Sequence, residues 1–251
     1  MIFNMKQLLI LLFVFSFQFS ASAQTTFISN GFIEYEKRMN QFSFYDKEDE
    51  ESIWITEMKK VFPKMVNDVY HLYFNNQKTI YKLGVENTTA KYMWGRKPSE
   101  TDITVQDVAN NRISVQRDVF EQTYLIKDSV QKYEWKITNE TRTIAGFECR
   151  KAVAIICDSV YVVAFYTDEI MVSSGPESFG GLPGMILGVA VPRLQITWFA
   201  TKVVIQQPTE ATLNPKQKGK LVSWEAYQKD LNRAMSDWGK YGSKVIWSSM
   251  L

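Results

Sequence analysis

The side chains best suited to chemistry in this chain are few and widely separated. It has one histidine, His71, and two cysteines, Cys149 and Cys157. A cysteine nucleophile needs a base nearby, and the aromatic, strand-like run around His71 favours a structural role for that histidine. Asp168 and Glu169 are adjacent carboxylates, but neighbouring strand residues point to opposite faces of a sheet. The sequence therefore predicts that the protein is not an enzyme, with catalysis by Cys149 or Asp168 as an alternative.

No sequence motif for a metal or cofactor accompanies these residues. The chain lacks the CxxC and HExxH metal motifs, the GxxxxGK[ST] phosphate loop and the GxGxxG dinucleotide turn. With a single histidine, a zinc or copper site would depend on carboxylates and methionines, which are scattered. We therefore predict no cofactor and no metal. The formal net charge of +2 also gives no electrostatic basis for binding nucleic acid.

The two cysteines are not expected to form a disulfide with each other. They flank the apolar run Arg150–Ile156, which is typical of one strand. Eight strand steps span roughly 26 Å, whereas a disulfide needs Cα atoms within about 7 Å. The sequence predicts two free thiols that pack as small apolar groups.

The N-terminus predicts export. Lys6 precedes the uninterrupted apolar run Leu8–Phe15, and Ala21-Ser22-Ala23 fits the small-x-small pattern of a signal peptidase site. We expect cleavage to remove residues 1–23 and to leave residues 24–251 as a single domain. The apolar run is shorter than the roughly 20 residues that cross a bilayer. The expected mature chain is therefore soluble and does not span a membrane.

Most of the remaining sequence alternates apolar and polar residues, which is typical of half-buried strands. Strands are predicted at Gly31–Lys37, Val69–Phe74, Thr79–Leu83, Ile103–Val108, Arg112–Gln116, Thr123–Lys127, Lys132–Thr138, Arg150–Cys157, Val160–Thr167, Met185–Val191 and Leu194–Ile205. Apolar residues at helical spacing predict helices at Asp46–Phe62 and Ser223–Trp238. Successive strands favour antiparallel pairing. We predict a mainly β (α+β) fold, a curved antiparallel sheet or half-barrel with helices packed against it.

One predicted hairpin bears on function. Asp158–Ser159 is expected to be a two-residue turn that joins Arg150–Cys157 to Val160–Thr167. In that register both faces of the hairpin are apolar. Both faces must then be covered, by helices, by the opposite wall of the sheet or by a bound apolar ligand.

The most unusual stretch is Gly175–Leu187, which contains four glycines and two prolines. Glycines at 180, 181 and 184 are expected to hold backbone angles that other residues avoid. Two roles stay open for this segment. It presents Leu182 and Met185 at one end of the sheet for binding, or it only turns the chain before the next strand.

The order of several sequence blocks resembles the GLPGLI family. These blocks, which cover roughly residues 70–190, are Leu72-Tyr73-Phe74-Asn75, Ile80-Tyr81, Trp135-Lys136-Ile137, Ile144–Ala152, Ala164–Ile170, Ser174-Gly175-Pro176 and Gly180–Leu187. Three positions depart from the family pattern: Met185 replaces leucine, Met171 stands where proline is common, and Phe165 stands for tryptophan. The layout is also similar, at the level of topology, to LolA-like half-barrels.

The resemblance implies an exported protein of a Gram-negative bacterium, located in the periplasm, from a family without known activity. We therefore expect a non-catalytic binding or carrier module for an apolar small molecule or lipid. The alternative is an accessory protein that docks on an outer-membrane or periplasmic protein. The candidate ligand- or partner-binding residues are Gly180, Gly181, Leu182, Pro183, Gly184, Met185 and Trp94.

Overall fold

A computed structural model describes residues 27–45, 52–93, 97–119 and 121–251. The predicted signal peptide, residues 1–23, and Trp94 lie outside these described ranges, so the signal peptide stays a prediction. Among the described residues, none of the helices has both the length and the apolar character needed to cross a bilayer.

The described strands form one sheet of twelve. In chain order they are β1 (Gly31–Asn40), β2 (Met65–Phe74), β3 (Lys78–Val85), β4 (Ile103–Asp107), β5 (Arg112–Val119), β6 (Gln122–Ser129), β7 (Lys136–Ile144), β8 (Phe147–Ile156), β9 (Val160–Thr167), β10 (Met185–Val191), β11 (Ile196–Val204) and β12 (Lys220–Val222). Across the sheet the order is β12-β6-β5-β4-β3-β2-β1-β11-β10-β9-β8-β7. All pairs are antiparallel except β12 with β6, which is parallel.

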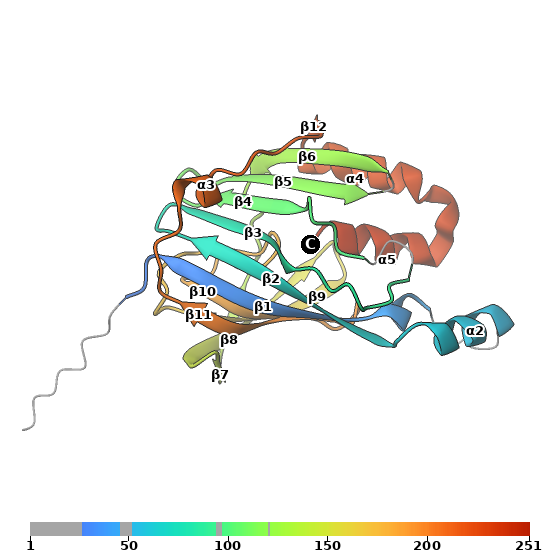
Figure 1. Ribbon diagram of the computed structural model, residues 1–251, viewed down its shortest axis with the longest axis horizontal. Helices are drawn as coiled ribbons and strands as arrows, with labels where there is room; N and C mark the ends of the chain where they lie inside the picture. The colour runs from blue at the N-terminus through green and yellow to red at the C-terminus, as the bar shows by residue number, and fades with distance from the viewer. Residues whose placement is uncertain (1–26, 46–51, 94–96, 120) are drawn as a thin grey trace, which may run out of the picture.

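The sheet is strongly curved and forms an open bowl (Figure 1). Strand β1 shows how the sequence sets its two faces: Ile33 and Tyr35 point inward and are fully buried, while Glu34 and Glu36 alternate with them and are partly exposed. The main core lies on the concave side. The predicted curved, mainly antiparallel sheet with packing helices is confirmed.

Helix α4 (Trp224–Ala234) closes one side of the bowl. The hydroxyl of Ser223 accepts a hydrogen bond from the backbone N–H of Ala226 and so caps the helix, a role for which serine is strongly preferred. The buried side chains of Trp224, Tyr227 and Leu231 pack on β5 and β6 in a second apolar cluster. The short helix η3 (Ser236–Trp238) follows α4 and completes the predicted Ser223–Trp238 helical segment.

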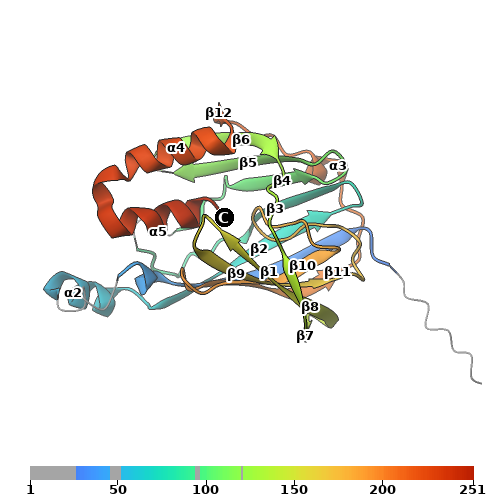
Figure 2. The same ribbon diagram turned by 180° about the vertical axis from the view of Figure 1, so that it is seen from behind.

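A last helix, α5 (Gly239–Ser249), was not predicted from the sequence. Its residues mix small, polar and apolar side chains, and Gly239 and Gly242 lower its intrinsic helix propensity. The two residues after it, Met250 and Leu251, are buried, and Figures 1 and 2 both show this end of the chain inside the bowl.

The predicted helix at Asp46–Phe62 differs from the structure. The described helix α2 spans only Ile53–Val61, with the residues before Ser52 outside the described ranges. Of its side chains only Ile55 is buried, whereas Trp54 is 42% and Val61 53% exposed. In Figure 1, α2 projects from the rim of the bowl. The prediction that this helix packs against the sheet was wrong, because its apolar stripe has no sheet surface beneath it. Two smaller helices complete the described elements: η1 (Gln41–Phe44) directly follows β1, and α3 (Glu210–Leu213) lies between β11 and β12 in the chain.

The predicted register of the β8–β9 hairpin was also wrong. The structure pairs Ile156 with Val160, so the loop has three residues, and Cys157 and Asp158 in it both have positive φ. This one-residue shift exchanges the faces of half the hairpin. One face is now continuous with the core, and the other exposes Ile155 and Tyr161. The expectation that both faces are covered does not hold.

Candidate functional site

The segment between β9 and β10 lies on the concave side of the sheet. It contains most of the predicted binding residues, and the structure buries the side chains of Leu182 (2% exposed) and Met185 (0%) in the core. Gly180 and Gly184 are buried as well, whereas Gly181 and Pro183 are exposed. This placement supports an architectural role for the segment. A binding role for these residues stays an untested prediction.

The glycines of this segment differ in backbone conformation. Gly181 has φ +83° and Gly184 has φ +141°, both of which favour glycine, but Gly180 does not have positive φ. The carbonyl of Gly180 instead accepts a hydrogen bond of 2.9 Å from the indole nitrogen of Trp135. The predicted special angles are thus confirmed for two of the three glycines.

A largely buried ionic cluster joins this segment to strands β1 and β5. Glu177 Oε1 lies 2.9 Å from Lys37 Nζ of β1, and Glu177 Oε2 lies 3.0 Å from Arg117 Nη2 of β5. Glu177 itself adopts φ +54°, which is uncommon for a residue with a side chain. The Lys37 ammonium also lies 5.3 Å from the ring centre of Tyr70 and 5.0 Å from that of Trp198. The ionic cluster is therefore enclosed by aromatic rings.

Charge and burial act in opposite directions on this ionic cluster. Burial alone raises the pKa of Glu177, but the charges of Lys37 and Arg117 outweigh it and hold the pKa below its ordinary value. At Asp102 burial prevails over the attraction of Arg117 and raises the pKa to about 6. Glu177 is thus an acceptor that stays ionised, while Asp102 titrates near pH 6.

Serine side chains of the same segment make further long-range contacts. Ser174 Oγ lies 2.8 Å from Thr79 Oγ1 and donates to Gln106 Oε1 at 3.1 Å. Ser178 Oγ donates to the carbonyl oxygen of Leu251 at 2.9 Å. Together with Glu177, these side chains tie the segment to β1, β3, β4, β5 and the C-terminal residues. Local sequence patterns carry no signal for these pairs, because the partners lie at least 60 residues apart in the chain.

The residues considered for catalysis do not come together in the structure. Cys149 and Cys157 are free thiols at opposite ends of β8, as predicted, and burial raises the pKa of Cys149 to about 12. Asp168 is exposed and lies 4.0 Å from Arg150 Nη2. His71 lies on the outer face, with Nε2 3.7 Å from Glu34 Oε2. Its pKa is lowered, chiefly by burial. In the part of the chain that the structure describes, no group of histidine, cysteine and carboxylate side chains is placed to hold a metal.

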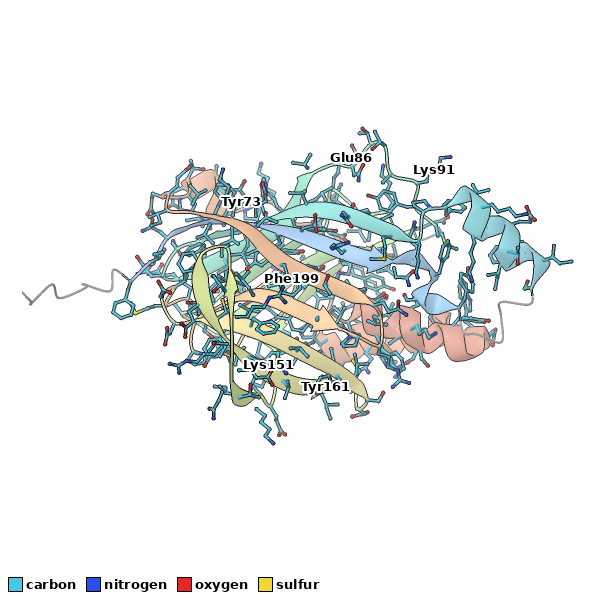
Figure 3. All side chains as sticks on the ribbon, turned by 90° about the horizontal axis from the view of Figure 1, so that it is seen from below. Tyr73, Glu86, Lys91, Lys151, Tyr161 and Phe199 are labelled. Carbon is cyan, nitrogen blue, oxygen red and sulfur yellow. The ribbon has the colours of Figure 1, made fainter. Side chains whose placement is uncertain are left out.

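The outer face of β8, β9 and β11 carries an apolar surface, here called the outer patch. Its members are Val153, Ile155, Tyr161, Val163, Phe165 and Phe199. Ile155 is 65% and Tyr161 45% exposed, and the two residues are directly paired across β8 and β9. The Arg142 guanidinium lies 4.7 Å from the ring centre of Phe199 and 5.7 Å from that of Phe165, and both of these half-buried rings also pack against the main core. Figure 3 views the molecule from this side, with Phe199, Lys151 and Tyr161 labelled.

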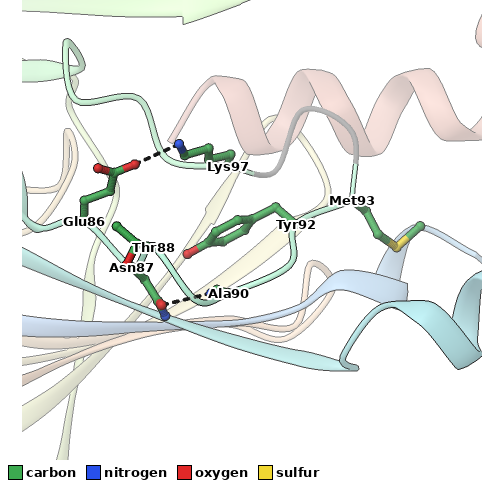
Figure 4. A pocket seen from close by; sticks show the side chains of 7 residues that line it. All are labelled: Glu86, Asn87, Thr88, Ala90, Tyr92, Met93 and Lys97. Carbon is green, nitrogen blue, oxygen red and sulfur yellow. Dashed lines mark hydrogen bonds and ion pairs between the residues drawn. The ribbon is translucent and has the colours of Figure 1, made fainter.

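A polar surface hollow of about 470 Å³ lies beside the segment that connects β3 to β4 (Figure 4). It is lined by Glu86, Asn87, Thr88, Ala90, Tyr92, Met93 and Lys97. A 2.8 Å ion pair joins Glu86 to Lys97, and the Tyr92 hydroxyl donates to Asp68. A second hollow, of about 600 Å³, lies at the β4–β5 hairpin. The hollow at Glu86–Lys97 lacks the apolar lining expected for a lipid carrier.

The protein is therefore an open, strongly curved β-sheet. Its concave face is filled by the β9–β10 segment and by the C-terminal residues of the same chain. Residues 58–228, more than half of the chain, match the family described as the N-glycanase peptide, N-terminal domain (PNGase F-II N-terminal domain). The chain belongs to this family. No curated protein sequence matches it. The resemblance to the GLPGLI family stays a prediction beside this membership.

Solved structures show the same fold. Two crystal forms of PNGF-II, in space groups C2 and P21, each superpose with a TM-score of 0.52 at 18% identity and cover 80% of this chain. The chain spans 32% of the length of those proteins. MucB in complex with MucA(peri) matches 77% of this chain and 57% of MucB, at 8% identity and a TM-score of 0.36, which is too low to indicate a shared function.

Proposed function

We propose that this chain is a non-catalytic accessory module of the cell envelope that docks a protein partner on its outer patch. The observation that carries the proposal is the paired exposure of Ile155 and Tyr161 on a face where the sequence led us to expect cover. Contiguous exposed apolar side chains mark interaction surfaces. Aromatic residues and arginine, here Tyr161, Phe165, Phe199 and Arg142, are the types enriched at such surfaces.

Family membership supports a protein as the partner. The similar solved proteins are about three times as long as the part this chain matches, so a domain of this kind is found within a larger protein. An N-glycanase is the first partner to test, because the family description names one. The filled concave face supports docking over the carrier role, since Leu182, Met185 and Phe179 occupy the position where a half-barrel would hold an apolar ligand. The predicted signal peptide supports the periplasm as the compartment.

The experiment is site-specific photo-crosslinking in cell envelopes. A photoreactive residue at position 155 is expected to give one discrete protein adduct, and the same residue at Lys127, an exposed strand position of β6, is expected to give none. Ile155→Lys should abolish co-purification of the crosslinked protein without changing the melting temperature. Equal adducts at both positions would refute docking on the outer patch. A lipid that co-purifies with the unmodified chain would favour the carrier role.

A further inference from the structure

The C-terminal residues of the chain lie in the bowl in the way that a bound peptide would. Three side chains from three separate elements donate hydrogen bonds to their backbone carbonyls. Arg117 Nη1 reaches the Ser249 carbonyl at 2.7 Å, Tyr227 Oη reaches the same oxygen at 3.3 Å, and Ser178 Oγ reaches that of Leu251 at 2.9 Å. The three donor side chains are themselves buried. Donors that bind backbone carbonyls recognise a peptide main chain rather than one side chain.

The two apolar side chains of this terminal stretch enter different surroundings. Met250 packs in the apolar cluster of α4, β5 and β6, and Leu251 packs in the main core of the bowl. Both are more than nine-tenths buried. Two adjacent residues thus pack in two different apolar clusters, next to three polar donors. This is the arrangement of a site for a short apolar peptide.

The helix that carries these residues is less buried than they are. Residues 243–249 of α5 all keep part of their surface exposed. The first residue, Gly239, has φ +52° with open space around it, and no side chain caps the helix start. Side contacts of α5 include Lys244 Nζ with the Ser43 carbonyl and Trp247 beneath the Arg193 guanidinium. An isolated helix of this length is only marginally stable in water, so α5 depends on its packing contacts, which also include Ile246, Trp247 and the Tyr241 ring against Tyr45, and on its buried last residues.

We propose that the concave face carries a binding site for a short apolar peptide segment, and that the chain's own residues Ser249–Leu251 occupy it. The recognition elements are Arg117, Ser178 and Tyr227, with the two apolar sites beside them. Gly239–Leu251 then acts as a strap, and a peptide of similar chemistry from a partner protein displaces it. This site is distinct from the outer patch and does not depend on docking there.

The test uses the full-length chain. Met250→Ser combined with Leu251→Ser removes the apolar anchors of the strap and leaves the receptor side chains in place. A fluorescein-labelled peptide of residues 245–251 is then titrated, with fluorescence anisotropy as the readout. We expect the double variant to bind the peptide at least ~10-fold more tightly than the unmodified chain, because the intact strap keeps the binding-competent state rare. Adding Ser178→Ala to the double variant should weaken that binding several-fold.

Two controls define the outcome. The same peptide with serine in place of its methionine and leucine should not bind. Ile53→Ser combined with Val61→Ser, which removes exposed apolar side chains from α2, should leave peptide binding as weak as in the unmodified chain. In hydrogen exchange of the unmodified chain, α5 amides should exchange much faster than those of β10. A folded double variant that does not bind the peptide overturns the proposal. Loss of the folded state in the double variant would also overturn the proposal. Protection of the α5 amides equal to that of the β10 amides would do the same, because the strap would then be part of the permanent core.

Discussion

A Cβ atom on Gly184 would lie 2.0 Å from the backbone carbonyl oxygen of Thr167. This contact brings the end of the β9–β10 segment directly against the end of β9, where only glycine fits. Gly181, in contrast, has positive φ but no atom closer than 3.8 Å to the same position. The two glycines therefore separate the cost of a steric clash from the cost of backbone strain.

Gly184→Ala is expected to destabilise the fold by more than ~3 kcal/mol, because backbone atoms of β9 must move. Gly181→Ala should cost only about 1 kcal/mol, from its positive φ alone. Urea denaturation of both variants measures the free energies of unfolding. Equal losses in the free energy of unfolding of the two variants would show that the close contact with the Thr167 carbonyl relaxes without cost.

Leu182→Ser tests whether the segment is architectural. Its side chain is 2% exposed in the main core, so we expect a loss of roughly 2–5 kcal/mol, as for other buried leucine truncations. Pro183→Ser, at the exposed neighbouring position, is the matched control and should change stability much less. A Leu182→Ser variant as stable as the unmodified chain would reopen the binding role of this residue.

Glu177→Gln is expected to be among the most destabilising conservative changes in the chain. It leaves the buried Arg117 and the partly buried Lys37 without this counter-charge, and breaking a buried ion pair costs about 3–5 kcal/mol. Glu140→Gln removes the partner of Lys151 at a largely exposed position and should cost at most ~1 kcal/mol. Denaturant titration of both variants at pH 7 gives the comparison. Similar small effects would mean that the cluster is solvated.

Asp102 should make stability depend on pH in a direction opposite to Glu177. Its pKa is about 6 in the folded chain against an ordinary value of 3.8, so the folded state binds its proton more tightly. Its contribution to stability therefore falls as pH rises from about 4 to about 6. For Glu177, whose pKa is lowered, the contribution is present above pH 4.5 and is lost on acidification below that value.

Asp102→Asn removes the pH-dependent contribution of Asp102 to stability. The substituted side chain keeps an oxygen that can accept a hydrogen bond from the Asp118 N–H. The variant should melt at a higher temperature than the unmodified chain at pH 7.5, and the difference should shrink by pH 4. Calorimetry at the two pH values measures it. A constant difference across this range would contradict the raised pKa.

Alkylation should distinguish the two thiols. Burial holds the pKa of Cys149 near 12, so in the native chain it should not react with iodoacetamide at pH 8. Cys157 is half-buried in the β8–β9 loop and should react first. After unfolding without reductant, mass spectrometry should find both thiols alkylated. A two-dalton deficit and no alkylation would reveal a disulfide.

Local sequence patterns were sufficient for most of the sheet. The bounds of β10 agree with the predicted Met185–Val191, and the predicted helical segment begins at Ser223, whose side chain caps α4. Asn75 turns the chain between β2 and β3 by accepting hydrogen bonds from the N–H groups of Gln77 and Lys78. These features depend on neighbours in the sequence.

The predictions that were wrong depend on information that is not local. The β8–β9 register depends on the backbone conformation of Cys157. This residue has φ +46° although it is not glycine, and sequence propensities do not predict a positive φ there. The amphipathic pattern of α2 gave a helix but did not specify whether a sheet lies beneath it. Residues of the candidate sites were missed because Glu177, Arg117 and Ser249 are brought together only by the completed bowl.

The position of Glu177 also has a consequence for the order of folding. Its two cations are 140 and 60 residues away in the chain, in β1 and β5, which are four positions apart in the strand order. Contacts at such separations form only after large loops have closed, which slows folding. We therefore expect the pairing of Glu177 with Lys37 and Arg117 to form late in folding, after β1–β5 and the segment that contains Glu177 have come together.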